Sequence, residues 1–147
     1  MFTLKNACRL SLVLSLLLLI FVALFIQNSR AAKARQERID ELVAACIADA
    51  HRAFDGYLSS PSEGSYRAAV SSFYALKVLY PESDCYDNDL FIALHQVYAK
   101  LLFISPESSD LQILADALEI LESNSSDIRA RVMLQTFAGF REGTTDG

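Results

Sequence analysis

Side chains that most often carry enzyme chemistry are few in this sequence of 147 residues. His51 and His95 are its only imidazoles, and it contains no glycine-rich phosphate loop and no G-x-S-x-G, H-E-x-x-H or C-x-x-C motif. His51 falls near Ile47 and Phe54 on one helical face, and His95 falls beside Phe91. We interpret both as helix-flank residues with partly buried rings, not as bases or ligands. The sequence therefore predicts a protein that is not an enzyme and that needs no cofactor.

Four carboxylates gather between two apolar segments: Glu82, Asp84, Asp87 and Asp89. Oxygen ligands at alternate positions suit Ca²⁺, but an EF-hand loop also needs a glycine for its sharp turn and a later Glu. Here Leu90 and Phe91 follow directly, and the loop has no glycine. Carboxylates also gather before helices, because the first N–H groups and the helix dipole attract them. We favour this second interpretation and expect no metal.

Three cysteines, Cys8, Cys46 and Cys85, are too few and too scattered for a disulfide framework or a zinc cluster. Cys8 lies before the long apolar segment described below, and the other two lie after it. In an oxidising compartment Cys46 and Cys85 would be able to form a disulfide. The spacing alone favours two unrelated thiols, one in the core and one in a loop.

Acidic residues dominate the chain after its N-terminal segment. From residue 31 onward, ten Lys and Arg stand against eighteen Asp and Glu. This balance argues against nucleic-acid binding, which rests on basic contacts to phosphates. It suits solubility, or an encounter with a basic protein partner. One hypothesis is a negative partner-binding surface made of Asp110, Asp116, Glu119 and Glu122; the alternative, which we favour, is a solvated face that only keeps the domain soluble.

These side chains belong to a chain whose first long feature is apolar. Residues 10–26, LSLVLSLLLLIFVALFI, contain no charge, glycine or proline. As a helix they would extend about 26 Å, close to the hydrocarbon thickness of a bilayer. A cleavable signal peptide is the alternative, with small residues at 29–34 as cleavage sites. The apolar run exceeds the roughly 7–15 residues of a signal peptide, so we favour an uncleaved transmembrane anchor.

Two rules disagree about the side of the membrane on which the following domain lies. Four Lys and Arg between residues 30 and 38 follow the apolar segment, whereas only Lys5 and Arg9 precede it. A count of these charges places the domain in the cytoplasm. A short basic head followed by an apolar run resembles a secretory signal, which stays inside and sends the next segment across. We favour a single-pass protein of the cell membrane with an extracytoplasmic domain.

Helical periodicity continues after the anchor. Apolar positions recur at helical spacing in residues 39–58, 66–80, 90–102, 111–121 and 130–140, and no segment alternates with the period of a strand. Short loops imply antiparallel neighbours. The sequence thus predicts an all-α fold: a transmembrane helix, able to continue into a stalk helix, and a small antiparallel bundle of about five helices. Two stacked, repeat-like helical hairpins are the alternative.

The expected organisation has five parts: a basic tail at 1–9, the membrane helix at 10–26, a stalk at 27–38, a helical domain at 39–141 and a disordered tail at 142–147. Ser60-Pro61-Ser62-Glu63 is the clearest helix start, with Ser60 as N-cap, Pro61 at the first helical position and Glu63 completing a capping box. The later helices are expected to begin with Asp87 or Asp89, Ser105 or Ser109, and Ser125 or Ser126 as N-caps.

A membrane anchor and a small helical domain without a catalytic residue set favour a binding function. We expect a non-catalytic accessory or scaffold subunit that docks another protein, as yet unidentified, through helix faces. The first alternative is a sensor-like bundle that holds a small molecule between its helices. A secreted helical protein, released by signal-peptide cleavage, is the second alternative.

Overall fold

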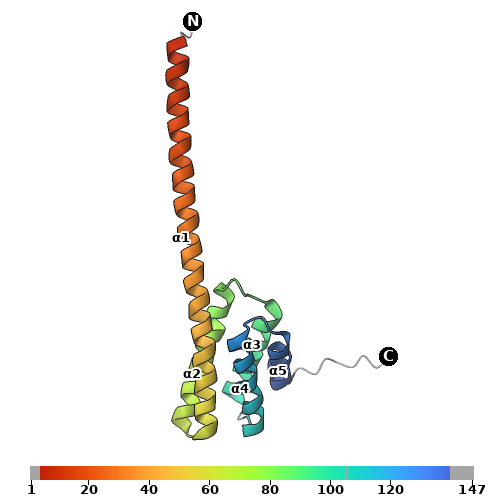
Figure 1. Ribbon diagram of the computed structural model, residues 1–147. Coiled ribbons are helices and arrows are strands. Elements are labelled where there is room, and N and C mark those ends of the chain that lie inside the picture. Colours follow the sequence, from red (N-terminus) through yellow and green to blue (C-terminus); the bar gives the residue numbers. More distant parts are fainter. Residues whose placement is uncertain (1–3, 105, 140–147) are drawn as a thin grey trace, which may run out of the picture. The chain divides into compact units, whose positions relative to one another are not determined.

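The computed structural model describes residues 4–104 and 106–139, and gives side chains from residue 13 onward. Its elements are α1 (Leu4–Ser59), α2 (Glu63–Leu79), the 3₁₀ turn η1 (Tyr80–Glu82), α3 (Asn88–Phe103), α4 (Ser108–Ser123) and α5 (Ile128–Ala138) (Figure 1). None of the described residues lies in a strand. The all-α prediction is confirmed. The tail predicted at 142–147 and the residues 1–3 lie outside the described residues.

The N-terminal part of α1 is the one candidate membrane span among the described residues. By length and composition it is able to cross a membrane, and its apolar side chains from Val13 to Ile26 are all exposed. The helix continues without interruption through Gln27–Ser29, which confirms that the apolar segment and the stalk form one helix. The chain divides into two units between Glu37 and Arg38, beside the expected boundary at 38/39.

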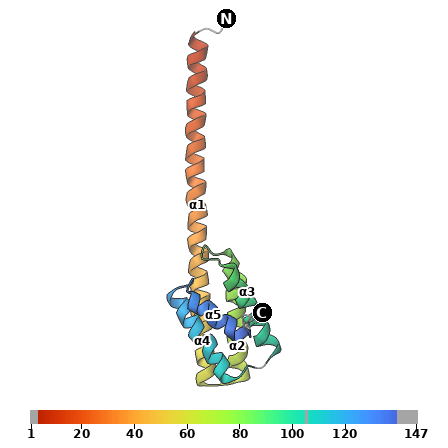
Figure 2. The same cartoon turned by 90° about the vertical axis from the view of Figure 1, so that its right-hand side faces the viewer.

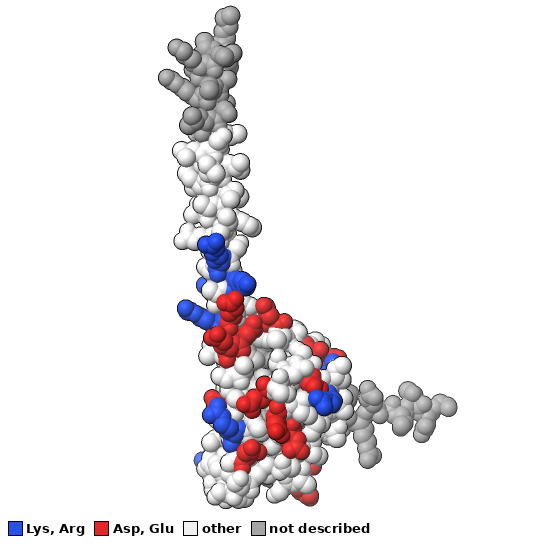
Figure 3. All heavy atoms as spheres, in the orientation of Figure 1, with Lys and Arg blue, Asp and Glu red and all other residues white. Residues whose placement is uncertain are grey.

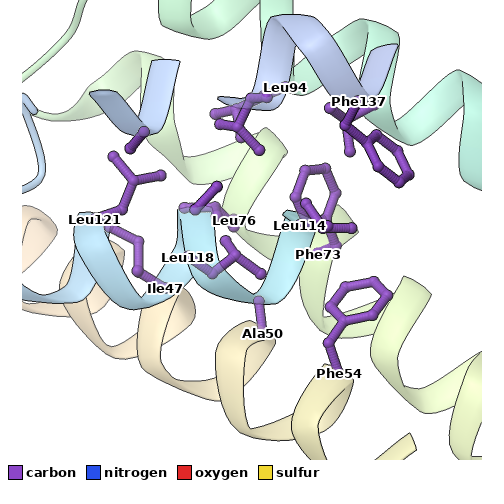
Figure 4. Close-up of a cluster of buried hydrophobic side chains, with 14 of the residues drawn as sticks. Ile47, Ala50, Phe54, Phe73, Leu76, Leu94, Leu114, Leu118, Leu121 and Phe137 are labelled. Atoms are coloured by element: carbon purple, nitrogen blue, oxygen red, sulfur yellow. The ribbon is translucent and has the colours of Figure 1, made fainter. Parts of the chain in front are cut away.

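The second unit, from Arg38 onward, is a bundle with one shared core. Its buried apolar side chains come from the C-terminal part of α1 and from α2, α3, α4 and α5. Figure 4 shows Ile47 and Phe54 of α1, Phe73 of α2, Leu94 of α3 and Leu118 of α4 directed into this common interior. All five are at most 1 % exposed. The helices form because apolar residues recur every three or four positions, and burying those stripes against one another stabilises the bundle.

The last helix closes the core. α5 packs against both α3 and α4 (Figure 2) and buries Ala130, Leu134 and Phe137. Its C-terminal end is held by Lys100 of α3, whose ammonium donates a 2.6 Å hydrogen bond to the backbone oxygen of Phe137. A cation near the last carbonyl groups of a helix is favourable, because those carbonyls carry the negative end of the dipole.

Three of the predicted helix starts need correction. Ser62, not Ser60, is the N-cap of α2: its hydroxyl accepts from the N–H of Ser65, and the Ser65 hydroxyl accepts from the N–H of Ser62. The N-cap residue of α4 is Glu107, which makes no side-chain capping bond, and that of α5 is Asp127. Asp87 caps α3 as expected, accepting from the N–H of Leu90 at 2.8 Å.

Candidate functional site

An exposed and half-buried apolar surface of the bundle lies along α2 and α3. On α2 the residues Tyr66, Val70, Tyr74 and Val78 follow one another at intervals of four, and therefore form one ridge. On α3, Tyr98 and Leu102 form the facing ridge. We call these six residues the α2–α3 face. Tyr74, Val78 and Leu102 are 47 %, 48 % and 51 % exposed, which is unusual for large apolar side chains so close together.

A groove of about 470 Å³ runs between the two ridges. Leu101, which is buried, lies at its base, and Glu63, Arg67 and Ser71 add polar groups at its edge. Its shape is fixed by a hydrogen bond of 2.8 Å from the Tyr66 hydroxyl to the backbone oxygen of Leu101. This bond ties α2 to α3 at the end of the groove. The groove is thus a preformed feature of the two helices.

Aromatic contacts define the other half of the groove. The rings of Tyr74 and Tyr98 lie 5.3 Å apart across the α2–α3 contact. The ammonium of Lys77 lies 4.7 Å from the Tyr98 ring centre and 5.4 Å from that of Tyr74, a cation–π arrangement. The rings of Tyr74 and Tyr98 and the ammonium of Lys77 therefore lie together at the α2–α3 contact, where a bound partner would contact them.

The apolar surface extends past the end of α3. Phe103 is 84 % exposed and Ile104 is 58 % exposed. A second hollow of about 360 Å³ is lined by residues that include Tyr57 of α1, Pro61 and Pro106, and it shares Glu63 and Tyr66 with the groove. The two hollows thus adjoin at Tyr66.

The four acidic residues considered for a partner surface make different contacts. Asp110 pairs with Lys100 of α3 at 3.0 Å, and Glu122 pairs with His51 of α1 at 2.9 Å. Asp116 accepts a hydrogen bond from Gln112 on its own helix, and Glu119 is exposed. Asp116, Glu119 and Glu122 share one side of α4 at intervals of three, whereas Asp110 turns toward α3. Asp and Glu outnumber Lys and Arg on the face of the domain that Figure 3 shows.

The two histidines make different contacts. His51 lies between two carboxylates: Nδ1 is 2.9 Å from Glu122 and Nε2 is 3.4 Å from Asp55. Its side chain is only 17 % exposed, so it joins α1 to α4 as a partly buried flank residue. His95 packs edge-on against the ring of Phe91 at 4.3 Å. Among the described side chains, neither histidine makes a hydrogen bond or ring contact with a nucleophile or with the other histidine.

The acids of the α2–α3 connection take part in local structure. Besides capping α3, Asp87 lies 3.5 Å from the Arg131 guanidinium of α5, and Asp89 lies 3.4 Å from it. The N–H of Asp84 donates to the carboxylate of Asp40 on α1. Among the described residues, no group of three His, Cys, Asp or Glu is arranged to hold a metal ion.

Cys46 and Cys85 are free thiols in this structure, so the disulfide considered from the sequence is not formed. Burial, and secondly the charge of Asp49, raise the pKa of the Cys46 thiol above its ordinary value, which lowers its thiolate fraction at neutral pH. Cys85 is exposed at the edge of a hollow of about 310 Å³. Val43, Ile47 and Leu121 give this hollow apolar walls.

No protein-family model, no curated protein and no solved structure matches this chain. The sequence patterns did not single out the α2–α3 face. In the sequence this face is visible only as a second apolar row on α2. The core buries one row, and the other row stays at the surface. The buried row is Ala69, Phe73 and Leu76, and the second row is Val70, Tyr74 and Val78.

Proposed function

We propose that this protein is a single-pass, membrane-anchored accessory or scaffold subunit that is not an enzyme and that binds a partner protein through its α2–α3 face. The observation that carries the proposal is the contrast between a closed core and this exposed apolar face. Among the described residues no buried side-chain polar atom lacks a hydrogen-bond partner, so the core needs no ligand to complete it. Exposed apolar patches with polar edges are typical of protein-binding surfaces.

An amphipathic helix of the partner is the occupant that the groove fits best. Two parallel ridges with a groove between them accept apolar side chains at positions i, i+3 or i+4, and i+7 of such a helix. Tyr74 and Tyr98 provide large, stiff contact areas, which dominate binding energy at many interfaces. Lys77, at the groove edge, suits a partner that carries a carboxylate beside its apolar row.

The anchor and the location form part of the proposal. We propose that the apolar part of α1 stays attached as a transmembrane helix in the cell membrane and that the domain lies outside the cytoplasm. Length beyond that of a signal peptide supports retention, and the short basic head supports export. Epitope tags at both ends, tested for protease accessibility on intact cells, report sidedness and cleavage together. A mature chain that lacks the N-terminal tag would favour the secreted alternative.

Site-specific photo-crosslinking in native membranes tests the docking face. A photoreactive phenylalanine at Tyr74 or Leu102 should give one adduct of fixed mass, and the same amino acid at Glu119 of α4 should not. Leu102→Asp should abolish the Tyr74 adduct without changing the melting temperature, because Leu102 lines the groove and is half exposed. An adduct formed only from position 119 would show that the partner binds the acidic side of α4 and not the α2–α3 face. Absence of adducts at all three positions would contradict a protein-docking role.

The hollow beside Cys85 supports a second candidate function, the binding of a small molecule. It combines the apolar walls described above with the polar groups of Asp40, Ser83 and Glu122, and pockets of this size and mixture hold small ligands. A ligand that binds the folded state raises the melting temperature. A thermal-shift screen that finds such a ligand would favour the sensor over the subunit if the shift is lost in Ala44→Glu, a change at an exposed residue that also lines this hollow.

A further inference from the structure

The helix α1 carries a ring of cations directly after its apolar part. Arg30, Lys33 and Arg35 are all exposed, and we call them the basic collar. Figure 3 shows basic side chains at the end of the uncharged surface of this helix. In the same unit Glu37 is the one described acid, and its contact with Lys33, at 3.9 Å between exposed groups, is weak. The collar therefore keeps most of its positive charge.

The helical geometry sets the depth of these cations. Counted from Ile26, the rise of an α-helix places Arg30 about 6 Å, Lys33 about 10 Å and Arg35 about 14 Å along the axis. The headgroup layer on each side of a bilayer is roughly 5–8 Å thick. Long basic side chains extend back toward that layer, so all three ammonium or guanidinium groups reach phosphate depth.

The collar surrounds the helix. At about 100° per residue, Lys33 and Arg35 point roughly 60° and 140° away from Arg30, in opposite directions. Lipids on every side of the helix therefore meet a cation. The remainder of the soluble chain has the opposite character, since residues 38–147 contain eight Lys and Arg against seventeen Asp and Glu.

We propose that the basic collar binds anionic phospholipid headgroups and so enriches these lipids around the anchor. This inference rests on the proposed function in one respect: the apolar part of α1 must lie in a bilayer. In the proposed topology the collar lies at the extracytoplasmic leaflet, so the anionic lipids that it binds belong to that leaflet. One Lys or Arg near an anionic membrane surface corresponds to about a fivefold preference, so a single anionic lipid that meets one cation of the collar should be favoured about fivefold. The attraction is electrostatic and is weakened by salt.

Spin-label electron paramagnetic resonance on the full-length chain in phosphatidylcholine vesicles tests the inference. A helix in the bilayer restricts the motion of adjacent labelled lipid. We expect labelled phosphatidylglycerol to be restricted about fivefold more than labelled phosphatidylcholine, and the preference to vanish in R30Q/K33Q/R35Q. The matched control is R52Q/R67Q/R129Q, which removes the same charge from exposed positions elsewhere and should keep the preference.

Each result has one meaning. Equal restriction of both lipids by the wild-type chain would overturn the collar and leave the anchor in place. Absence of any restricted lipid would show that α1 is not embedded and would overturn the proposed function as well. Inorganic phosphate should reduce the preference no more than chloride at equal ionic strength, and a larger reduction would assign the collar to free phosphate instead.

Discussion

The backbone N–H of Asp87 donates a 2.9 Å hydrogen bond to the phenol oxygen of Tyr80, a side chain that is only 1 % exposed. The same hydroxyl donates to the backbone oxygen of Cys85, also at 2.9 Å. One buried side chain at the end of α2 thus satisfies two backbone groups of the segment that leads to α3. Since Asp87 caps α3, the Tyr80 side chain helps to fix the residue at which α3 begins.

Removal of the Tyr80 hydroxyl should therefore destabilise the bundle. In Tyr80→Phe the ring still fills the core, but the N–H of Asp87 and the oxygen of Cys85 lose their partner. We expect a loss of about 1–2 kcal/mol in the free energy of unfolding, measured by urea denaturation. A loss below the error of the measurement would show that these two backbone groups find water instead.

Alkaline pH should act through the same residue. Burial raises the pKa of Tyr80 to about 12, although its hydrogen bond from Asp87 partly opposes the shift. The unfolded phenol titrates near pH 10. Because the folded pKa is the higher one, the stability contributed by the neutral phenol is complete below pH 10 and declines as the pH rises toward 12. Tyr80→Phe should show a shallower decline between pH 9 and 11, and parallel slopes for both proteins would contradict the assignment.

The start of α2 distinguishes two neighbouring serines. Ser62→Ala removes the capping hydroxyl and should cost about 1 kcal/mol of stability. Ser60→Ala should cost almost nothing, because Ser60 contributes its backbone oxygen, which accepts from the Ser65 hydroxyl. Paired denaturation curves of the two variants check this, and an equal loss in both would contradict the capping box that the structure shows.

Two carboxylates of α4 should differ in their contribution to the free energy of unfolding, measured in the same way. Asp110→Asn weakens the hold on the partly buried Lys100 and should lower the free energy of unfolding by about 1 kcal/mol. Glu119→Gln changes an exposed position and should stay within about 0.5 kcal/mol of the wild type. If the order is reversed, Asp110 is not the partner of Lys100 in solution.

The periodicity of apolar residues was enough to predict the helices, because a stripe such as Leu111, Leu114, Leu118 and Leu121 admits one regular conformation. The choice between Ser60 and Ser62 was not predictable from the general pattern, because both serines precede polar residues able to complete a cap. Ser62 is paired with Ser65 in place of the Glu that the usual capping box contains.

The candidate site depends on contacts that sequence spacing does not contain. Glu122 and His51 are separated by 71 positions, and Tyr66 and Leu101 by 35. Nothing in the local pattern around Asp110 or Glu122 shows that a base from another helix lies beside each of them. The apolar row of Tyr74 and Val78 was visible in the sequence, but only the placement of α3 shows which row the core leaves exposed.

The order of synthesis adds a consequence to the place of α1 in the core. Ile47 and Phe54 leave the ribosome early, and Phe73 of α2, whose ring lies 6.3 Å from that of Phe54, follows soon afterwards. The side chains of α4 follow only about 70 residues later, as the separation of 71 positions between His51 and Glu122 indicates. At the usual rate of translation the wait lasts about 4–14 s. During this time the apolar side chains of α1 that face α4 remain exposed on the growing polypeptide. We therefore expect newly made chains to depend on a chaperone until α4 has emerged.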